Sequence, residues 1–165
     1  CRLREDVHAF VALLKKYFPE FKNAELLFTA AQTGVRETRH IKGEHVLTGE
    51  EYLNAVHFED AVSRGAHPID IHTAGDTTQK CQFLKNAAYI PYRSLIVPGF
   101  DNLLVAGRCF SADQVASASV RVQASVMGLG QAAGCAAAQC ACAGTSVHKA
   151  DVHTLQAMLR NYLNV

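Results

Sequence analysis

The sequence of 165 residues has no tryptophan, two methionines and four prolines, and it carries few charges. Charged residues make up 19% of the chain, below the roughly 25% of an average soluble domain, while 49% of the residues are hydrophobic. This composition excludes intrinsic disorder. No sign of charge is in excess, because 16 Lys and Arg face 15 Asp and Glu. We therefore expect no nucleic acid partner, since phosphate binding needs clustered positive charge.

The six cysteines have spacings that fit neither a CxxC pair nor a zinc site, and we expect no metal. A chain of this length can bury a core without disulfides, so we expect free thiols that pack as small hydrophobic side chains. Free thiols and the lack of a recognisable signal peptide favour a cytoplasmic protein. Because the first residue is Cys1 rather than methionine, we interpret the chain as a fragment of a longer protein.

One long uncharged stretch, Val122 to Val147, is long enough to span a bilayer. It consists mostly of Ala, Gly, Ser and Cys, with few of the large aliphatic residues that drive membrane insertion. Gly130, Gly134 and Ala138 stand four apart and form a ridge of small residues on one helix face. In a membrane this ridge would be a dimerisation seam, whereas in a soluble protein it allows close packing against a sheet or ligand. We favour the second interpretation and expect no membrane partner.

Helices are expected in three places. Residues 4–17 place apolar side chains on one face, and residues 125–143 form an Ala-rich segment that ends at Gly144, a residue typical of helix C-termini. Asp151 is expected to begin the last helix. Thr48 is the expected cap of a further short helix.

Strands are expected where apolar and β-branched residues alternate or run together. Leu103 to Gly107 is a continuous apolar run of the kind found in strands buried on both faces. The mixture of strands and helices predicts an α+β fold or an incomplete α/β fold. The remaining expectations are extended segments at residues 25–32, 35–41, 66–72 and 89–95, a turn of helix at 58–64 and a polar loop at 74–88.

The passage from 103–107 through Gly107-Arg108 into the helix at 125–143 is the main candidate for a binding site. A strand end followed by a helix N-terminus binds anionic cofactors in open α/β sheets, although any buried strand followed by a helix looks similar. A second pattern, Gly128 to Ala133, matches GxGxx[GA]. It would need a buried strand at 119–127, and the polar residues there argue against one.

Two other groups of residues could take part in chemistry. Arg36 and Arg39 would point to opposite faces of a strand, so they are not expected to clamp one substrate carboxylate together. Ordinary ion pairing is the alternative for them. Asp70 and His72 share a strand face and could form an acid–base pair, or His72 could be an ordinary surface histidine.

Four strings occur in the order found in a known family. GVRETRHIKGEHVLT (34–48), HPIDIH (67–72), YIPYRSLIVPGFDNLLVAGRCFSA (89–112) and SVRVQASVMGLGQAAGCAAA (119–138) resemble the C-terminal region of FAD-dependent oxidoreductases. The resemblance implies the C-terminal half of an FAD-binding Rossmann-like domain of the fumarate reductase or glutathione reductase type. It also implies part of a β-containing substrate or capping region.

The same resemblance assigns roles to particular residues. It places Arg36 and Arg39 in the substrate-side region, as candidate catalytic residues beside His72 from the acid–base pair above. It also divides the chain into a helical lead-in (1–30), a substrate-side region (31–95) and the C-terminal part of the FAD-binding domain (96–165). It implies hydride transfer between FAD and an organic substrate. The residues that it places near the flavin are Gly107, Arg108, Arg121, Val122 and Ser125.

No strand followed by a glycine-rich phosphate loop precedes residue 30, so we expect weak or no FAD binding by these residues alone. The implied partners are the rest of the parent chain, with the N-terminal FAD-binding half, and a small-molecule substrate. The alternative is a non-enzymatic interaction or assembly module that keeps the fold without FAD. In that case the apolar helix face would be covered by another chain or by self-association.

Overall fold

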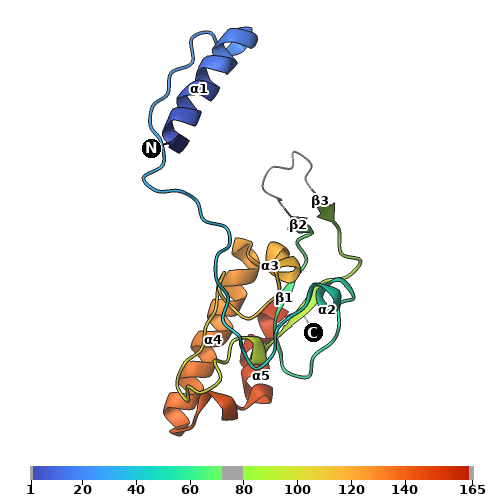
Figure 1. Cartoon of the computed structure of the whole chain (residues 1–165). Helices are drawn as coiled ribbons and strands as arrows, with labels where there is room; N and C mark the ends of the chain where they lie inside the picture. Colours follow the sequence, from blue (N-terminus) through green and yellow to red (C-terminus); the bar gives the residue numbers. More distant parts are fainter. Residues whose placement is uncertain (1, 72–79, 164–165) are drawn as a thin grey trace. The chain divides into compact units, whose positions relative to one another are not determined.

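The computed structural model describes residues 2–71 and 80–163 (Figure 1), and the chain forms two compact units, residues 1–35 and 36–165. The first unit contains α1 (Arg2–Tyr17) and the 3-10 helix η1 (Pro19–Phe21). The helix expected at 4–17 is thus confirmed. It ends where Pro19, which has no amide hydrogen, begins the next turn.

The strands expected at 25–32 and 35–41 are wrong, because both segments lack regular secondary structure. Leu27 and Phe28, the large apolar residues in the middle of the run at 25–32, are 85% and 83% exposed, so this part of the run is not packed in a core. An apolar run becomes a strand only when a neighbouring strand takes its backbone hydrogen bonds, and neither segment is part of a ladder.

The second unit contains two small antiparallel sheets. The first pairs β1 (Ala61–Gly65) with β4 (Ala88–Pro91), and the second pairs β2 (Ile69–Ile71) with β3 (Lys80–Gln82). β2 lies within the extended segment expected at 66–72. The segment expected at 89–95 is a strand only up to Pro91, where β4 ends, and it continues as a 3-10 helix at Tyr92–Ser94. The helical turn expected at 58–64 is wrong, since pairing with β4 draws this segment into β1.

Six further helical segments follow in the described part of the second unit. The two short ones near the sheets are α2 (Gly49–Leu53) and the 3-10 helix η2 (Tyr92–Ser94). The rest are α3 (Gln114–Val120), α4 (Gln123–Ala143) and α5 (Val152–Leu163), with the 3-10 helix η3 (Val147–Lys149) between the last two.

The helix ends agree with the sequence. The Thr48 side chain accepts a hydrogen bond from the Glu51 amide, and the Glu51 side chain bonds the Thr48 amide, so that the two form a capping box. Gly144 ends α4 with φ of 60°, a conformation that favours glycine. Asp151 accepts a hydrogen bond from the Thr154 amide at the start of α5.

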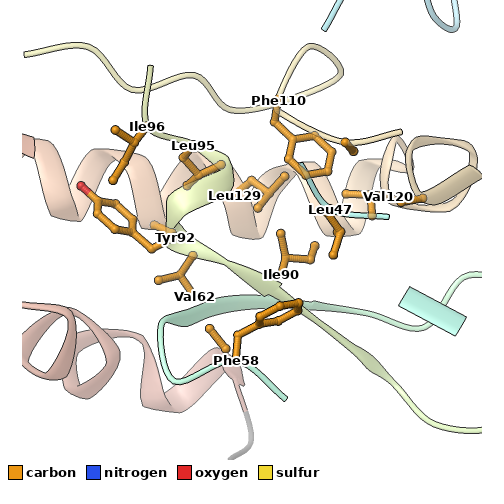
Figure 2. Close-up of a cluster of buried hydrophobic side chains, with 14 of the residues drawn as sticks. Leu47, Phe58, Val62, Ile90, Tyr92, Leu95, Ile96, Phe110, Val120 and Leu129 are labelled. Carbon is orange, nitrogen blue, oxygen red and sulfur yellow. The ribbon is translucent and has the colours of Figure 1, made fainter. Parts of the chain in front are cut away.

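The hydrophobic core lies between the β1–β4 pair and α4 (Figure 2). Leu47, Ile90 and Phe110 come from three separate segments and are almost fully buried beside Leu129 of α4. The side of α4 that faces this core carries residues spaced three or four apart, as expected of a helix with one buried face. They are Ser125, Leu129, Ala132, Ala136 and Cys140.

The buried strand expected at 103–107 is wrong. Leu104 forms a single antiparallel bridge with Ile96, and the Val105 amide donates to the Leu95 carbonyl. Leu103 is 39% exposed. This bridge and this hydrogen bond reach only Leu95 and Ile96, so the segment does not reach the length of a sheet strand.

The helices bear on two other expectations. Residues 120–127 end α3 and begin α4, so the GxGxx[GA] pattern lies inside a helix and forms no phosphate loop. Helix α4 is long and apolar enough to cross a membrane by length and composition, which is weak evidence on its own. The prediction of buried thiols holds for Cys140 but is wrong for Cys81, Cys109 and Cys142, which are exposed free cysteines.

The combination of helices with small antiparallel sheets confirms the α+β class. Within residues 2–71 and 80–163, both sheets have only two strands. The finer expectation of half a Rossmann-like domain stays a prediction, as does the boundary at residue 95.

Candidate functional site

The junction between α3 and α4 presents hydrogen-bond donors. Asp113 caps the start of α3, where its Oδ1 accepts from the Ala116 amide at 2.8 Å, and Arg121 ends the helix. Val122 then begins α4 as an N-cap without a side-chain hydrogen bond to the helix. The next residues, Gln123 and Ala124, are exposed. The first turn of α4, where the positive end of the helix dipole lies, is therefore at the surface, while the Val122 amide donates to the Ser119 carbonyl.

The Arg121 side chain is held beside this junction. Its guanidinium Nη2 donates to the Asp70 carbonyl of β2 at 3.1 Å, and Nη1 lies 3.7 Å from Glu37 Oε2. The side chain is 13% exposed, so its charge is close to the surface but mostly shielded from water. Arg121 thus joins the end of α3 to two segments that are distant in the sequence.

Glu37 and His40 continue the network. His40 Nε2 lies 3.2 Å from Glu37 Oε1, and His40 Nδ1 lies 3.1 Å from the Phe110 carbonyl. The Ile41 amide donates to the Cys109 carbonyl at 2.9 Å, so residues 40–41 run along residues 109–110. These contacts replace the strand pairing that was expected for residues 35–41.

A further ion pair joins Arg36 to Asp70, with Nη1 of Arg36 lying 4.0 Å from Oδ2 of Asp70. The Arg36 side chain is 64% exposed, and Arg39 is exposed as well. The expectation that the two arginines lie on opposite faces of a strand is wrong, because residues 35–41 form no strand. The charged cluster, as we call it from here on, consists of Arg36, Glu37, His40, Asp70 and Arg121.

The turn at Gly107 leads into the cluster. Gly107 has φ of +90°, which favours glycine, and the exposed Arg108 follows it. The next two residues, Cys109 and Phe110, provide the carbonyls that contact Ile41 and His40. The turn therefore belongs to the same neighbourhood as the cluster through the backbone of residues 109–110.

The predicted site residues meet only in part. Arg36 and Arg121 both contact Asp70, and Val122 follows Arg121 directly at the start of α4. Ser125 is buried on the core side of α4 rather than exposed at its first turn. His72 lies outside the described residues.

Sequence reasoning missed the roles of Glu37 and His40. Both stand inside the string that carries the resemblance, and their spacing of three residues allows the side chains to meet. That spacing alone is a common arrangement, however, and the partners Phe110 and Arg121 lie far away in the sequence. Only the fold brings these groups together.

The donor set can be compared with what FAD requires. Amide groups, a helix dipole and a guanidinium are all donors or positive charges, so they fit an acceptor-bearing edge of a flavin ring. The ADP half of FAD needs a glycine-rich turn between a strand and a helix. In the two described stretches of chain, β1 leads to β2 and β4 leads to η2, without such a turn. The residues therefore fit the flavin half of the cofactor and not the ADP half.

A hollow in the surface lies outside the charged cluster. It has a volume of about 530 Å³ and lies between β1 and the first half of α4, with Ser63, Arg64, Met127 and Gly128 in its lining. Arg64 itself lies over the Tyr89 ring at 4.9 Å. Among the described side chains, no group of three His, Cys, Asp or Glu could hold a metal ion.

Comparison with known proteins gives one match. A family model described as FAD dependent oxidoreductase matches residues 1–159. No curated protein and no solved structure matches the chain at a significant level. The family model covers nearly the whole chain, including the charged cluster and all of α4.

Proposed function

The chain belongs to the FAD-dependent oxidoreductase family, and FAD is the cofactor of the protein. From this premise, we propose that these residues form the flavin side of an active site that transfers a hydride between FAD and an organic small molecule. The N-terminal FAD-binding half is then supplied by another part of the parent protein, which makes this chain a fragment that is inactive by itself. We also place the parent protein in the cytoplasm, with neither nucleic acid nor a membrane as a partner.

The start of α4 is the observation that carries the proposal. Its N-cap, Val122, makes no side-chain hydrogen bond to the helix, and the preceding residue, Arg121, carries a guanidinium that contacts the Asp70 carbonyl and Glu37. A helix N-terminus carries roughly half a positive charge. Together these groups stabilise the negative charge that the cofactor gains on reduction, one of the ways in which a protein tunes a cofactor.

The other predicted residues take roles around this position. Gly107 and Arg108 form the turn that approaches the cofactor, while Arg36 and Arg39 orient the substrate from the exposed side of the cluster. When bound, FAD would supply the two-electron acceptor for the hydrogen and electron pair of a substrate C–H bond. The proton from the neighbouring hydroxyl or amine passes to a base, and His72 is our candidate.

The proposal is tested by the absorbance spectrum of the natural full-length protein and of its Arg121→Gln variant. The wild type should carry stoichiometric FAD, which bleaches when an oxidisable substrate is added without oxygen. A substrate deuterated at the reacting carbon should bleach it several-fold more slowly, because the C–H bond breaks in that step. Arg121→Gln should bind FAD more weakly. A full-length protein without flavin contradicts the proposal.

The second candidate function is an interaction or assembly module. It is favoured by the exposed side of α4, where Met127 is 69% exposed beside small residues. A contiguous apolar surface of this kind suggests contact with another chain. A flavin-free full-length protein that forms a stable complex through this face would support the module instead of the enzyme.

A further inference from the structure

The carboxylate of Glu37 has both oxygens in contact with other groups of the site. Oε1 lies 3.2 Å from His40 Nε2, and Oε2 lies 3.7 Å from Arg121 Nη1. The Glu37 side chain is 23% exposed, so these interactions are only partly screened by water. We propose that Glu37 is a positioning residue of the flavin site, which holds the Arg121 guanidinium in place beside the start of α4. This inference rests on the function proposed above.

The local structure explains why such a residue is needed. Residues 36–41 form neither helix nor strand, so no ladder of backbone hydrogen bonds fixes their position. One side of the segment is attached to residues 109–110, through the Ile41 amide and the His40 ring. Glu37 provides the link from His40 to the α3–α4 junction, because it contacts His40 and Arg121 at the same time.

Arg121 depends on such contacts for its geometry. An arginine side chain is long and flexible, and its planar donors act at a fixed angle only when they are held by partners. The Asp70 carbonyl holds one nitrogen at 3.1 Å, and Glu37 faces the other. Two partners in different directions fix the guanidinium plane, whereas the Asp70 carbonyl alone leaves it free to rotate.

A simpler role for Glu37 gives the opposite expectation. If the carboxylate acted through its charge alone, its removal would leave the site more positive. FAD binding would then become tighter and the flavin reduction potential would rise, because both the bound phosphates and the reduced ring are negative. If Glu37 positions Arg121, its removal frees the guanidinium, and binding weakens while the potential falls. The two roles therefore differ in sign.

The experiment uses the natural full-length protein with four substitutions. Glu37→Gln removes the carboxylate charge, Glu37→Asp keeps the charge on a shorter side chain, and Arg121→Gln removes the guanidinium. Glu59→Gln is the matched control, since it makes the same charge change at an exposed residue. The dissociation constant for FAD and the flavin reduction potential are measured for each folded variant, as judged by its melting curve.

We expect Glu37→Gln and Arg121→Gln to weaken FAD binding by about tenfold each and to lower the potential, although they change the charge in opposite directions. Glu37→Asp should show a smaller loss of FAD affinity. A protein that carries both Glu37→Gln and Arg121→Gln should bind FAD no worse than Arg121→Gln alone. In the FAD-free protein, the Arg121 Nε–H signal should exchange faster in Glu37→Gln than in Glu59→Gln.

The inference is overturned if Glu37→Gln leaves FAD affinity and potential unchanged, or if it moves either one opposite to Arg121→Gln. Should Glu37→Gln not fold, Glu37→Asp decides, because a role through charge alone predicts wild-type values for it. The wild type separates this result from the proposed function. A wild type without FAD overturns both, whereas a wild type with FAD and an unaffected Glu37→Gln overturns the role of Glu37 alone.

Discussion

At the scale of single residues, Gly65 is a position where a methyl group has no room. A Cβ added there would lie against the hydroxyl of Tyr52, which is fully buried. We expect Gly65→Ala to lower the free energy of unfolding by about 1–3 kcal/mol, as overpacked core substitutions do. Urea denaturation measures the change.

Gly130 provides the control, because a Cβ there meets nothing within 4 Å. Gly130→Ala should raise the free energy of unfolding by roughly 0.5–1 kcal/mol through helix propensity. Equal changes in the free energy of unfolding for both substitutions would contradict the close contact between Gly65 and Tyr52.

Asp113 joins two helices through one side chain. Its Oδ1 accepts from the Ala116 amide in α3, and its Oδ2 accepts from the Gly49 amide at the start of α2, both at 2.8 Å. We expect Asp113→Ala to cost about 2 kcal/mol, the loss of an N-cap plus that of a charge-assisted hydrogen bond. Asp151→Ala removes the cap of α5 and the exposed hydrogen bond from the Thr154 hydroxyl, but no contact to a second helix through its side chain, and should cost about 1 kcal/mol. Equal losses in urea denaturation would contradict the double role of Asp113.

At the scale of elements, local signals predicted α1, α2, α4 and α5 but not α3, and they wrongly predicted a helical turn at 58–64. The cap at Thr48, the glycine at 144 and the regular apolar spacing of residues 4–17 act within one helix, so the sequence nearby contains them. Strand predictions failed at 25–32, 35–41 and 103–107 because strand formation depends on distant residues. Residues 103–107 have the composition of a buried strand, but a strand also needs neighbours, which the local sequence does not reveal.

The contacts that hold η3 to Glu44 and Phe100 should depend on pH, because they are made by the His148 ring. Its ring contacts the Glu44 carboxylate and the Phe100 carbonyl. The hydrogen bond to Glu44, together with the Phe100 carbonyl and the charge of Asp101, raises the pKa of His148 above its ordinary value of about 6.5. A raised pKa means that the folded state binds the proton more tightly than the unfolded state. The resulting stability is fully present below about pH 6.5 and is lost as the pH rises through the folded-state value.

We therefore expect the melting temperature to fall between pH 6 and pH 8 by more in the wild type than in His148→Gln. An NMR titration of the ring should place the pKa of His148 above that of an unfolded peptide. His153→Gln, which changes another exposed histidine, should keep the wild-type pH dependence. A titration of His148 at or below the peptide value would contradict the ion pair with Glu44.

At the scale of the whole molecule, the sequence says little about which distant residues meet. The resemblance placed Arg121 and Val122 near the flavin, which stays a prediction, and the structure shows them as adjacent cap residues between α3 and α4. The link from Arg121 to Glu37 spans 84 positions, counted as 121 minus 37, and follows from tertiary packing alone. Long-range contacts of this kind leave no periodic trace in a single sequence.

The isolated 165-residue chain should bind FAD weakly or not at all. The donors at the start of α4 fit the flavin half of the cofactor, while the described residues offer no glycine-rich turn for the phosphates. A fluorescence titration of the purified chain with FAD should show no saturation at concentrations that saturate the full-length protein. A purified chain that is yellow with stoichiometric FAD would contradict this expectation.

The most direct test of the account is amide hydrogen exchange in the full-length protein with and without FAD. The proposed flavin site lies at the first turn of α4, so FAD should slow amide exchange at Gln123 and Ala124. Exchange near Gly144, at the opposite end of the helix, should not change. Protection by FAD that appears elsewhere and leaves the first turn of α4 unaffected would contradict the central claim.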